Sequence, residues 1–421
     1  MTDNMSRAEL VLNGKMSIID YICKIAATDD EERHPNDLIY WETVRDAHKN
    51  GKKLIVTNGP VPAEILYALD CVPLSLDLIP TRLSQDEVLT TKLINDAETR
   101  ANCALCSLHK TNLGALLSKN LGVTPDAYVT VPIPCDSDRT ACTETARYIE
   151  APSFNFDIPL RRDERGIRYI EMQFDRFVGF IEDLSGKKLD WDKVKYRMGL
   201  YNLSAQLLKR CAEFRTNRPC PMSSRMTVWN ELMNAFGPTE EMGRLIESEI
   251  EICKKRIASG ESPCPNGEEH RMLLMHNLWR QGIDITDWLE KEYSSVTVAD
   301  GYCFDERELF DLDNKTTCIN LMCRRMLSGS MAHGAGVSGE ELLKSIEKLI
   351  SSYAPDVFIF LGNRGCRHVW AATKQVSDVI QERYRASMLM LDIDNIDFRY
   401  KSEKEIRTLI SEYMDTVVNK K

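Results

Sequence analysis

Apolar and polar positions follow two alternating patterns in the first part of the chain. Short apolar runs end in turn residues, as at 53–60 and 127–133, and a stretch with a 3.6-residue period lies between them at 105–119. Short apolar runs bounded by turn residues are typical of buried strands, whereas the longer period is typical of amphipathic helices. Strands that alternate with helices at this spacing predict a parallel sheet covered by helices on both faces.

The same alternation returns in the last part of the chain, after a long helical stretch. Apolar runs occur at 295–300, 356–362 and 387–392, while the 3.6-residue period dominates from about 165 to 285. Two helices of the last part are predicted to begin with capping boxes, Ser338-Gly-Glu-Glu341 and Ser402-Glu-Lys-Glu405.

These patterns predict an α/β protein with two flavodoxin- or Rossmann-like doubly wound parallel-sheet lobes. We expect a ligand site in the cleft between the lobes, because clefts between domains are common binding sites. The expected organisation is an N-terminal helical segment at 1–50, a first α/β lobe at 51–165, a helical connector at 166–285 and a second α/β lobe at 286–421.

Charge and composition narrow the choice of partners. The 421 residues have a formal net charge of −10 and contain no basic cluster, so nucleic acid is an unfavourable partner. No window approaches 18 uninterrupted apolar residues, and the polar start lacks the apolar core of a signal peptide. We therefore expect a cytoplasmic protein with no membrane span.

The fourteen cysteines are informative in such a chain. A disulfide framework belongs to small secreted proteins, whereas cysteine-rich cytosolic chains more often bind metal ions or iron–sulfur clusters. Some are expected to be small core residues, because their neighbours are apolar. This group consists of Cys23, Cys71, Cys211 and Cys253.

Three other cysteines share one setting, the junction between a strand and the next helix or the start of a helix. Cys106 opens a predicted helix, Cys135 follows the apolar run at 127–133, and Cys366 follows the run at 356–362. A helix N-terminus lowers the pKa of a thiol, and Gly365 lets the backbone approach closely. Three thiolates that face a cleft would hold a [4Fe–4S] cluster and leave one iron open.

The spacing of these cysteines alone is also compatible with other kinds of site. Cys103 and Cys106, with His109, resemble half of a zinc site, but a structural zinc site needs a second pair at short spacing. The stretch 334–339 fits G-x-G-x-x-G but follows no predicted strand, so we interpret it as a loop that leads to Ser338. The sequence contains no P-loop motif.

Several motifs occur in a fixed order and are together more specific than any one of them. They are Val61-Pro62-Ala-Glu64, the helix opened by Cys106, Cys135-Asp136, Val296-Thr-Val-Ala-Asp300-Gly-Tyr-Cys303, Gly365-Cys366 and Leu391-Asp-Ile-Asp-Asn-Ile-Asp-Phe-Arg399. In this order they resemble the iron–sulfur component (component D) of the 2-hydroxyacyl-CoA dehydratases. That component is homologous to the cluster subunits of benzoyl-CoA reductase. The resemblance runs from about residue 50 to the end and is weakest in the helical middle.

The resemblance implies a mechanism and a set of partners. An ATP-dependent iron–sulfur activator protein would deliver one low-potential electron to the thioester carbonyl of a 2-hydroxyacyl-CoA. The resulting ketyl radical anion would expel the hydroxyl group, and after loss of a proton the electron would be recycled, so that the net change is loss of water. By this resemblance Cys106, Cys135 and Cys366 are the ligands of a [4Fe–4S] cluster, and Asn58 and Glu64 lie near it as catalytic residues. A homologous second cluster subunit would complete the enzyme.

The same family includes another branch, homodimeric proteins with a double-cubane [8Fe–9S] cluster that reduce small molecules. Such a cluster needs about six cysteines per chain. Cys103 and Cys303 are the favoured extra ligands, whereas Cys318 and Cys323 are expected in the core. Cys142 and Cys264 complete the set of candidates. A benzoyl-CoA-reductase-type subunit and an electron-transfer or cluster-storage protein are further alternatives.

Overall fold

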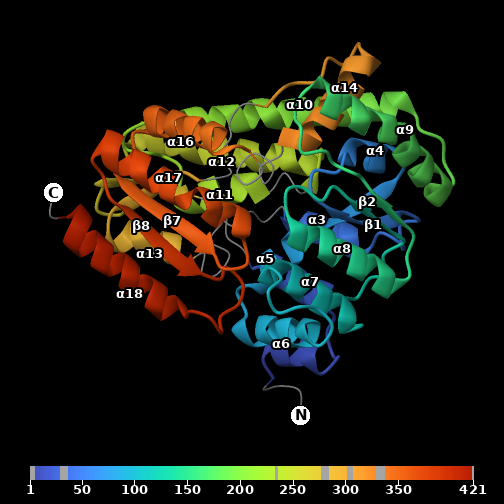
Figure 1. The fold of residues 1–421 in the computed structure, drawn as a ribbon, viewed down its shortest axis with the longest axis horizontal. Coiled ribbons are helices and arrows are strands. Elements are labelled where there is room, and N and C mark those ends of the chain that lie inside the picture. The colour runs from blue at the N-terminus through green and yellow to red at the C-terminus, as the bar shows by residue number, and fades with distance from the viewer. Residues whose placement is uncertain are drawn as a thin grey trace.

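The computed structural model describes residues 5–28, 37–232, 236–275, 284–300, 307–328 and 337–419. Within these ranges the chain forms two four-stranded sheets, one in each lobe (Figure 1). All neighbouring strands in both sheets are parallel. Helices cover the sheets on both sides, so the predicted pair of doubly wound α/β lobes is confirmed.

The two sheets have the same topology. The strand order is β2-β1-β3-β4 in the first sheet and β6-β5-β7-β8 in the second, so each places its first strand between its second and third. The first sheet consists of β1 (Lys53–Asn58), β2 (Cys71–Ser75), β3 (Ala127–Thr130) and β4 (Ser153–Asn155). The second consists of β5 (His270–Met275), β6 (Ser295–Ala299), β7 (Val357–Asn363) and β8 (Met388–Ile393).

Strand β5 lies in the stretch 166–285, for which we expected a helical connector. Its sequence, His-Arg-Met-Leu-Leu-Met, contains no β-branched residue and resembles a piece of buried helix. A short apolar run of this kind does not distinguish a strand from a helix by its period. The first strand of the second sheet therefore begins earlier in the chain than the pattern indicated.

Side chains alternate between the two faces of each sheet. In β1, Leu54 and Val56 belong to one buried cluster, and Ile55 belongs to another on the opposite face. In β7, Phe358 packs on one face and Ile359 on the other. Both faces are apolar because both are covered, as in other parallel sheets. The cysteines expected in the core, including Cys318 and Cys323, are all buried.

The described residues of the first lobe also form eight helices, several of which make up the lower part of the view in Figure 1. Helices α6 and α7 pack closely against each other, and α7 also packs against α8. The set consists of α1 (Arg7–Leu12), α2 (Ile18–Ala26), α3 (Asp37–Arg45), α4 (Ala63–Ala68), α5 (Leu78–Leu83), α6 (Glu87–Glu98), α7 (Ser107–Leu117) and α8 (Asp136–Ile149).

Long helices run along the top of Figure 1 and join the two lobes. Helix α10 packs against both α12 and α4, and α14 packs against α9. Gly186 ends α9 in the left-handed conformation, with a φ of 69° that glycine adopts without strain. The group consists of α9 (Glu164–Ser185), α10 (Trp191–Phe214), α12 (Glu240–Ser259) and α14 (Lys315–Ser328), while the shorter α11 (Ser224–Leu232) packs against β6 and α13 (Asp284–Glu292).

The helices of the second lobe include the two with predicted capping boxes. Both boxes are confirmed, because Ser338 and Ser402 accept hydrogen bonds from the backbone N–H groups of Glu341 and Glu405, and each glutamate reaches back. The lobe contains α13 (Asp284–Glu292), α16 (Gly339–Tyr353), α17 (Arg367–Tyr384), α18 (Glu403–Tyr413) and the π-helical turn η3 (Met414–Val418). Across the ranges described above, no helix combines the length and apolar character needed to span a bilayer.

Candidate functional site at the junction of the lobes

The three cysteines singled out by the sequence each occupy the N-cap of a helix. Cys106 precedes α7, Cys135 precedes α8 and Cys366 precedes α17. The first turn of a helix has backbone N–H groups without partners inside the helix, and these groups attract negative charge. At α8 this is observed directly, since the N–H of Asp138 donates to Sγ of Cys135 at 3.4 Å.

Cys135 is farther from its strand than the sequence suggested. Strand β3 ends at Thr130, five residues before Cys135, because Pro132 and Pro134 have no N–H to continue the ladder. The intervening residues lead from the sheet to the start of α8. Cys366, by contrast, follows β7 after only two residues, Arg364 and Gly365.

The two lobes bring these cysteines together. A Cβ added to Gly365 would lie 2.9 Å from the Cα of Cys106, so the backbones of the second and first lobes nearly touch. The N–H of Cys106 donates to Oγ of Ser137, two residues after Cys135, at 3.0 Å. Nδ2 of Asn363, at the end of β7, lies 3.6 Å from Sγ of Cys106. The site is therefore shared between the lobes.

Burial raises the pKa of the Cys135 thiol to about 11, while hydrogen bonds from the backbone of Asp138 and Ser137 act in the opposite direction. Burial also raises the pKa of Cys366 to about 11, against hydrogen bonds from Val369 and His368. In addition, Cys366 raises the pKa of Cys135, and Cys106 raises that of Cys366, as expected for thiols grouped together. A positively charged metal centre would favour the thiolates and reverse this effect.

No group of three His, Cys, Asp or Glu side chains in the described ranges is arranged to hold a single metal ion. This includes the half zinc site considered from the sequence, in which Cys103 is exposed and His109 is buried on α7. A cubane cluster differs from a single ion, because each cysteine binds a different iron and the thiols stand apart. Thiol sulfur with backbone N–H donors beside it is the donor chemistry that such a cluster uses.

Asn58 lies at the carboxyl end of β1 and joins a buried polar group beside the site. Its Nδ2 donates to Oδ1 of Asp138 and lies 3.2 Å from Sγ of Cys142. The Cys142 thiol donates to the same Asp138 oxygen at 3.0 Å. Burial raises the pKa of Asp138 to about 7, which its hydrogen bonds from Cys142 and Asn58 partly oppose. Asn58 is thus linked to the helix that begins at Cys135.

Glu64 is placed differently. It is fully buried in the first turn of α4, and its Oε1 forms an ion pair with Nη1 of Arg325 at 2.5 Å. Arg325 comes from α14 and stacks over the ring of Tyr201 from α10, with 4.1 Å from its Cζ to the ring centroid. Its partner among the described residues is thus an arginine of the helical layer, and Glu64 is not brought to the cysteines by a direct bond.

The additional cysteines are scattered. Cys103 is exposed three residues before Cys106, and its carbonyl oxygen accepts a hydrogen bond from Nζ of Lys110 at 3.1 Å. Cys142 is tied to Asp138, and Cys264 is buried at 3% exposure. Cys303 lies outside the described residues, as does the first half of the glycine motif at 334–339.

Two residues of this site were not predicted. Ser137 and Asn363 touch Cys106 from different lobes, and neither belongs to a motif that binds metal. Asn363 ends β7 as Asn58 ends β1, so a polar amide at the carboxyl end of a strand was the available signal. The contact between Asn363 and Cys106, which lie 257 residues apart, could be found only from the way the two lobes pack.

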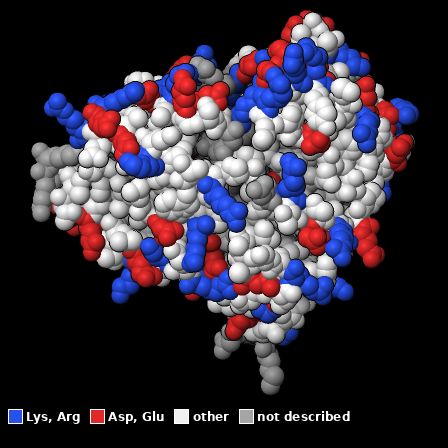
Figure 2. Space-filling view, in the orientation of Figure 1, with Lys and Arg blue, Asp and Glu red and all other residues white. Residues whose placement is uncertain are grey.

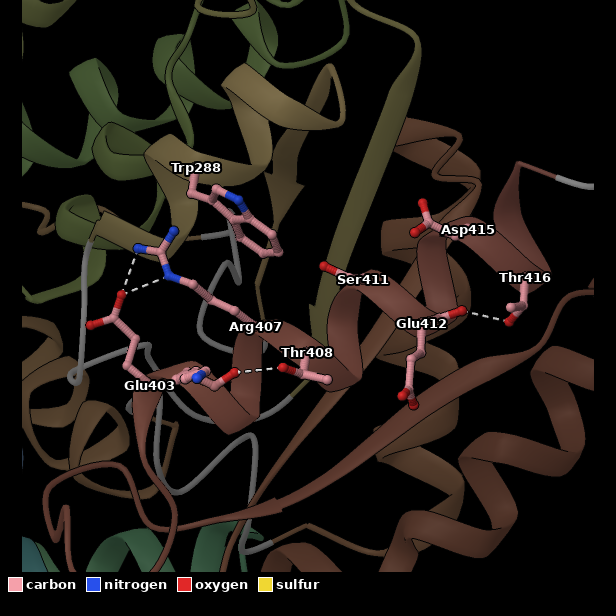
Figure 3. Close-up of a pocket in the computed structure, with 9 residues that line it drawn as sticks. Trp288, Glu403, Arg407, Thr408, Ser411, Glu412, Asp415 and Thr416 are labelled. Atoms are coloured by element: carbon pink, nitrogen blue, oxygen red, sulfur yellow. Dashed lines mark hydrogen bonds and ion pairs between the residues drawn. The ribbon is translucent and has the colours of Figure 1, made fainter.

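A surface groove lies elsewhere on the second lobe, between α13 and α18 (Figure 3). It has a volume of about 740 Å³, and none of its described lining residues is a cysteine. Arg407 spans it, with its Cζ 5.0 Å from the centroid of the Trp288 ring and its Nε 2.7 Å from Oε1 of Glu403. At this end of the groove Arg407 and Glu403 form an ion pair with each other.

The surface is of mixed charge, although the chain is acidic overall. Figure 2 shows several lysine and arginine side chains on the front face where the lobes meet. Arg364 and Arg367, which flank Cys366 in sequence, are exposed. The half-buried Cys366 therefore has basic residues near it in sequence.

The fold and the site define a two-lobed α/β protein with a cysteine site at the junction of its lobes. The model of the family "2-hydroxyglutaryl-CoA dehydratase, D-component" matches residues 60–417, so the chain belongs to this family. This confirms the family indicated by the sequence motifs.

Two distant relatives carry dehydratase names. The chain is 22% identical to the (R)-phenyllactyl-CoA dehydratase alpha subunit of Clostridium sporogenes over 66% of its own length and 67% of that protein. It is 24% identical to subunit alpha of (R)-2-hydroxyglutaryl-CoA dehydratase from Acidaminococcus fermentans over 31% of its length. The second match spans 28% of that relative, under a third of its length.

Proposed function

We propose that Cys106, Cys135 and Cys366 together hold one [4Fe–4S] cluster. The observation that carries this proposal is the meeting of three helix N-caps, two from the first lobe and one from the second, with a cysteine at each. When bound, such a cluster supplies a low-potential electron and an open iron that can act as a Lewis acid.

Residues around the site would stabilise the thiolate sulfurs and hold the two lobes close together. The N–H of Asp138 donates toward Sγ of Cys135, and Nδ2 of Asn363 donates toward Sγ of Cys106, so both would stabilise thiolate sulfur. Gly365 allows the two lobes to meet at Cys106 without a side chain between them. Asp138, buried with Asn58 and Cys142, can hold a proton on its carboxyl group at neutral pH.

The ligand set can be tested on the anaerobically reconstituted protein. Cys135→Ala should abolish the oxygen-sensitive visible absorption of the cluster. Cys211→Ala is a matched control, because Cys211 is also a reduced cysteine but is buried in the core at 1% exposure. A cluster that survives in Cys135→Ala would remove this residue from the ligand set.

We infer further that the chain is the iron–sulfur subunit of a radical 2-hydroxyacyl-CoA dehydratase. Membership of the D-component family and two relatives named as dehydratase alpha subunits support this inference. The remaining partners would be a homologous second subunit, an ATP-dependent iron–sulfur activator and an acyl-CoA substrate. The alternative is a homodimeric double-cubane reductase, which needs about six ligands per chain, with Cys103 and Cys303 as the favoured extra ligands.

The reaction can be tested with the purified chain, its second subunit, an activator and ATP under anaerobic conditions. A panel of (R)-2-hydroxyacyl-CoA thioesters should yield enoyl-CoA products, seen by mass spectrometry as a loss of water. The reaction should require both ATP and the activator. Reduction of small molecules by the chain and activator alone, with no dehydration of any thioester, would instead favour the homodimeric reductase.

A further inference from the structure

The segment after β8 carries the acidic motif at 391–399, and each charged member of it has a defined partner. Oδ2 of Asp392 accepts from the hydroxyl of Tyr400 at 2.6 Å, within the second lobe. Asp397 accepts from the backbone N–H and from Nε of Arg399 at 3.0 and 2.8 Å. The motif therefore holds its own loop in one conformation and fixes the direction of the Arg399 side chain.

Asp394 connects this loop to the first lobe. Its Oδ1 accepts a hydrogen bond from the hydroxyl of Ser107, the residue that directly follows Cys106. The same oxygen accepts from the backbone N–H groups of Ile396 and Asp397 at 3.0 and 2.9 Å. Asp394 is 8% exposed and Ser107 is fully buried, so this contact is shielded from water.

Arg399 makes a second connection to the first lobe. Its guanidinium forms a two-pronged contact with Glu98 of α6, Nη1 to Oε2 at 3.1 Å and Nη2 to Oε1 at 3.0 Å. Nη1 also donates to Oδ1 of Asn95 at 2.5 Å. Figure 1 shows the segment after β8 descending beside α6, in agreement with these contacts. A planar fork of this kind fixes orientation as well as distance.

Glu98 links Arg399 to the segment that precedes Cys106. Its Oε1 also accepts from Nζ of Lys110 at 2.8 Å, and Lys110 in turn donates to the carbonyl oxygen of Cys103. Arg399, followed by Lys110, lowers the pKa of Glu98 to about 2, so this carboxylate is charged at neutral pH. The segment that leads into Cys106 is thus held by the second lobe through Glu98.

The other end of the connection reaches Cys366. The N–H of Arg364 donates to the carbonyl oxygen of Ile393, directly before Asp394, at 2.8 Å. The loop that carries Cys366 and the loop that carries Asp394 are therefore joined at their starts. Through them, Ser107 on the first lobe is linked to Cys366 on the second.

We propose that Ser107, Asp394, Arg399 and Glu98 form a latch that sets the spacing between Cys106 and Cys366 across the two lobes. They are positioning residues, since none of them is among the three thiols proposed to bind the cluster. The proposal rests on the proposed function, because the spacing matters only if both thiols bind one cluster. The latch itself exists in the chain without the cluster, and this allows the two ideas to be tested separately.

The first test measures the latch in the full chain without iron. Spin labels on click-reactive non-natural residues at the exposed positions Val88 and Lys374 would report the distance between the lobes by pulsed electron resonance. The double variant Ser107→Ala/Arg399→Met should broaden this distance distribution, with about a tenfold rise in the fraction of separated lobes. Arg407→Met is the matched control, because Arg407 pairs with Glu403 inside α18 and should leave the distribution unchanged.

The second test uses the reconstituted cluster. Ser107→Ala should keep the wild-type melting temperature within the spread of the Arg407→Met control but alter the electron paramagnetic resonance spectrum and lower the retention of iron. Arg399→Lys, which keeps the charge but loses the fork, should be intermediate between wild type and Arg399→Met. Wild-type spectra and an unchanged lobe distance in the double variant would overturn the latch. A wild-type chain that takes up no iron would instead overturn the proposed function, while the distance measurement would still decide the latch.

Discussion

Replacing Gly365 with alanine would place a methyl group against the backbone of the opposite lobe. The new Cβ would lie 2.9 Å from the Cα of Cys106, 3.4 Å from its N and 3.5 Å from its Cβ. The first distance is far inside normal carbon–carbon contact, which begins near 3.5 Å. The nearest atom belongs to a backbone, so the clash cannot be relieved by rotation of a side chain. The start of α7 or the loop before α17 must move.

The magnitude follows from the cost of overpacking, about 1–3 kcal/mol for one added carbon in a packed site. The control is Gly179→Ala in the middle of α9, where an added Cβ meets nothing within 4 Å. This variant should be stabilised by about 0.5–1 kcal/mol, because glycine is unfavourable inside a helix. Calorimetry of the two variants should show shifts of the melting temperature in opposite directions.

Gly365→Ala should also retain less iron after anaerobic reconstitution, since Cys106 and Cys366 would be forced apart. Gly179→Ala should retain as much as the wild type. If Gly365→Ala were as stable as the wild type and bound iron equally well, the close approach of the lobes at this point would be refuted.

Two further predictions concern buried charge and pH. Arg325→Met should destabilise the protein by about 3–5 kcal/mol in urea unfolding, because it leaves Glu64 buried without its cation. Adding Glu64→Gln should restore part of that loss. A double variant no more stable than Arg325→Met would contradict this prediction. The hydrogen bond to Asp356 raises the pKa of His270, so its contribution should be complete below pH of about 6.5 and be lost as the pH rises through the higher folded-state value. The melting temperature of His270→Gln should accordingly fall furthest below that of the wild type near pH 5.5, and a difference independent of pH would be evidence against the pair.

Much of the fold could be predicted from local pattern. The strands that end at Asn58 and Asn363 are apolar runs closed by turn residues, and Ser338 and Ser402 are capping residues with a glutamate three positions later. These signals act within a few residues, where propensity and hydrogen bonding decide the structure. The start of the second sheet could not be predicted in the same way, because the Met and Leu residues of β5 favour a strand only once neighbouring strands are present.

The site could be predicted only in part, because only its local features are visible in the sequence. A cysteine at a predicted helix start or strand–helix junction is visible in the sequence, and Cys106, Cys135 and Cys366 all lie at helix N-caps. Contacts between distant parts of the chain were not visible, such as Asn363 with Cys106 or Ser107 with Asp394. They depend on how the lobes pack, and no local pattern encodes that packing.

The central claim is that one cluster is bound by thiols from both lobes. The most direct measurement is iron and acid-labile sulfide per chain after anaerobic reconstitution of the wild type, Cys106→Ser and Cys366→Ser. We predict about four irons and four sulfides in the wild type, and a large loss in either variant, since each removes one of three ligands. About eight irons would contradict a single cubane, and no iron, or full iron content in both variants, would contradict the shared site.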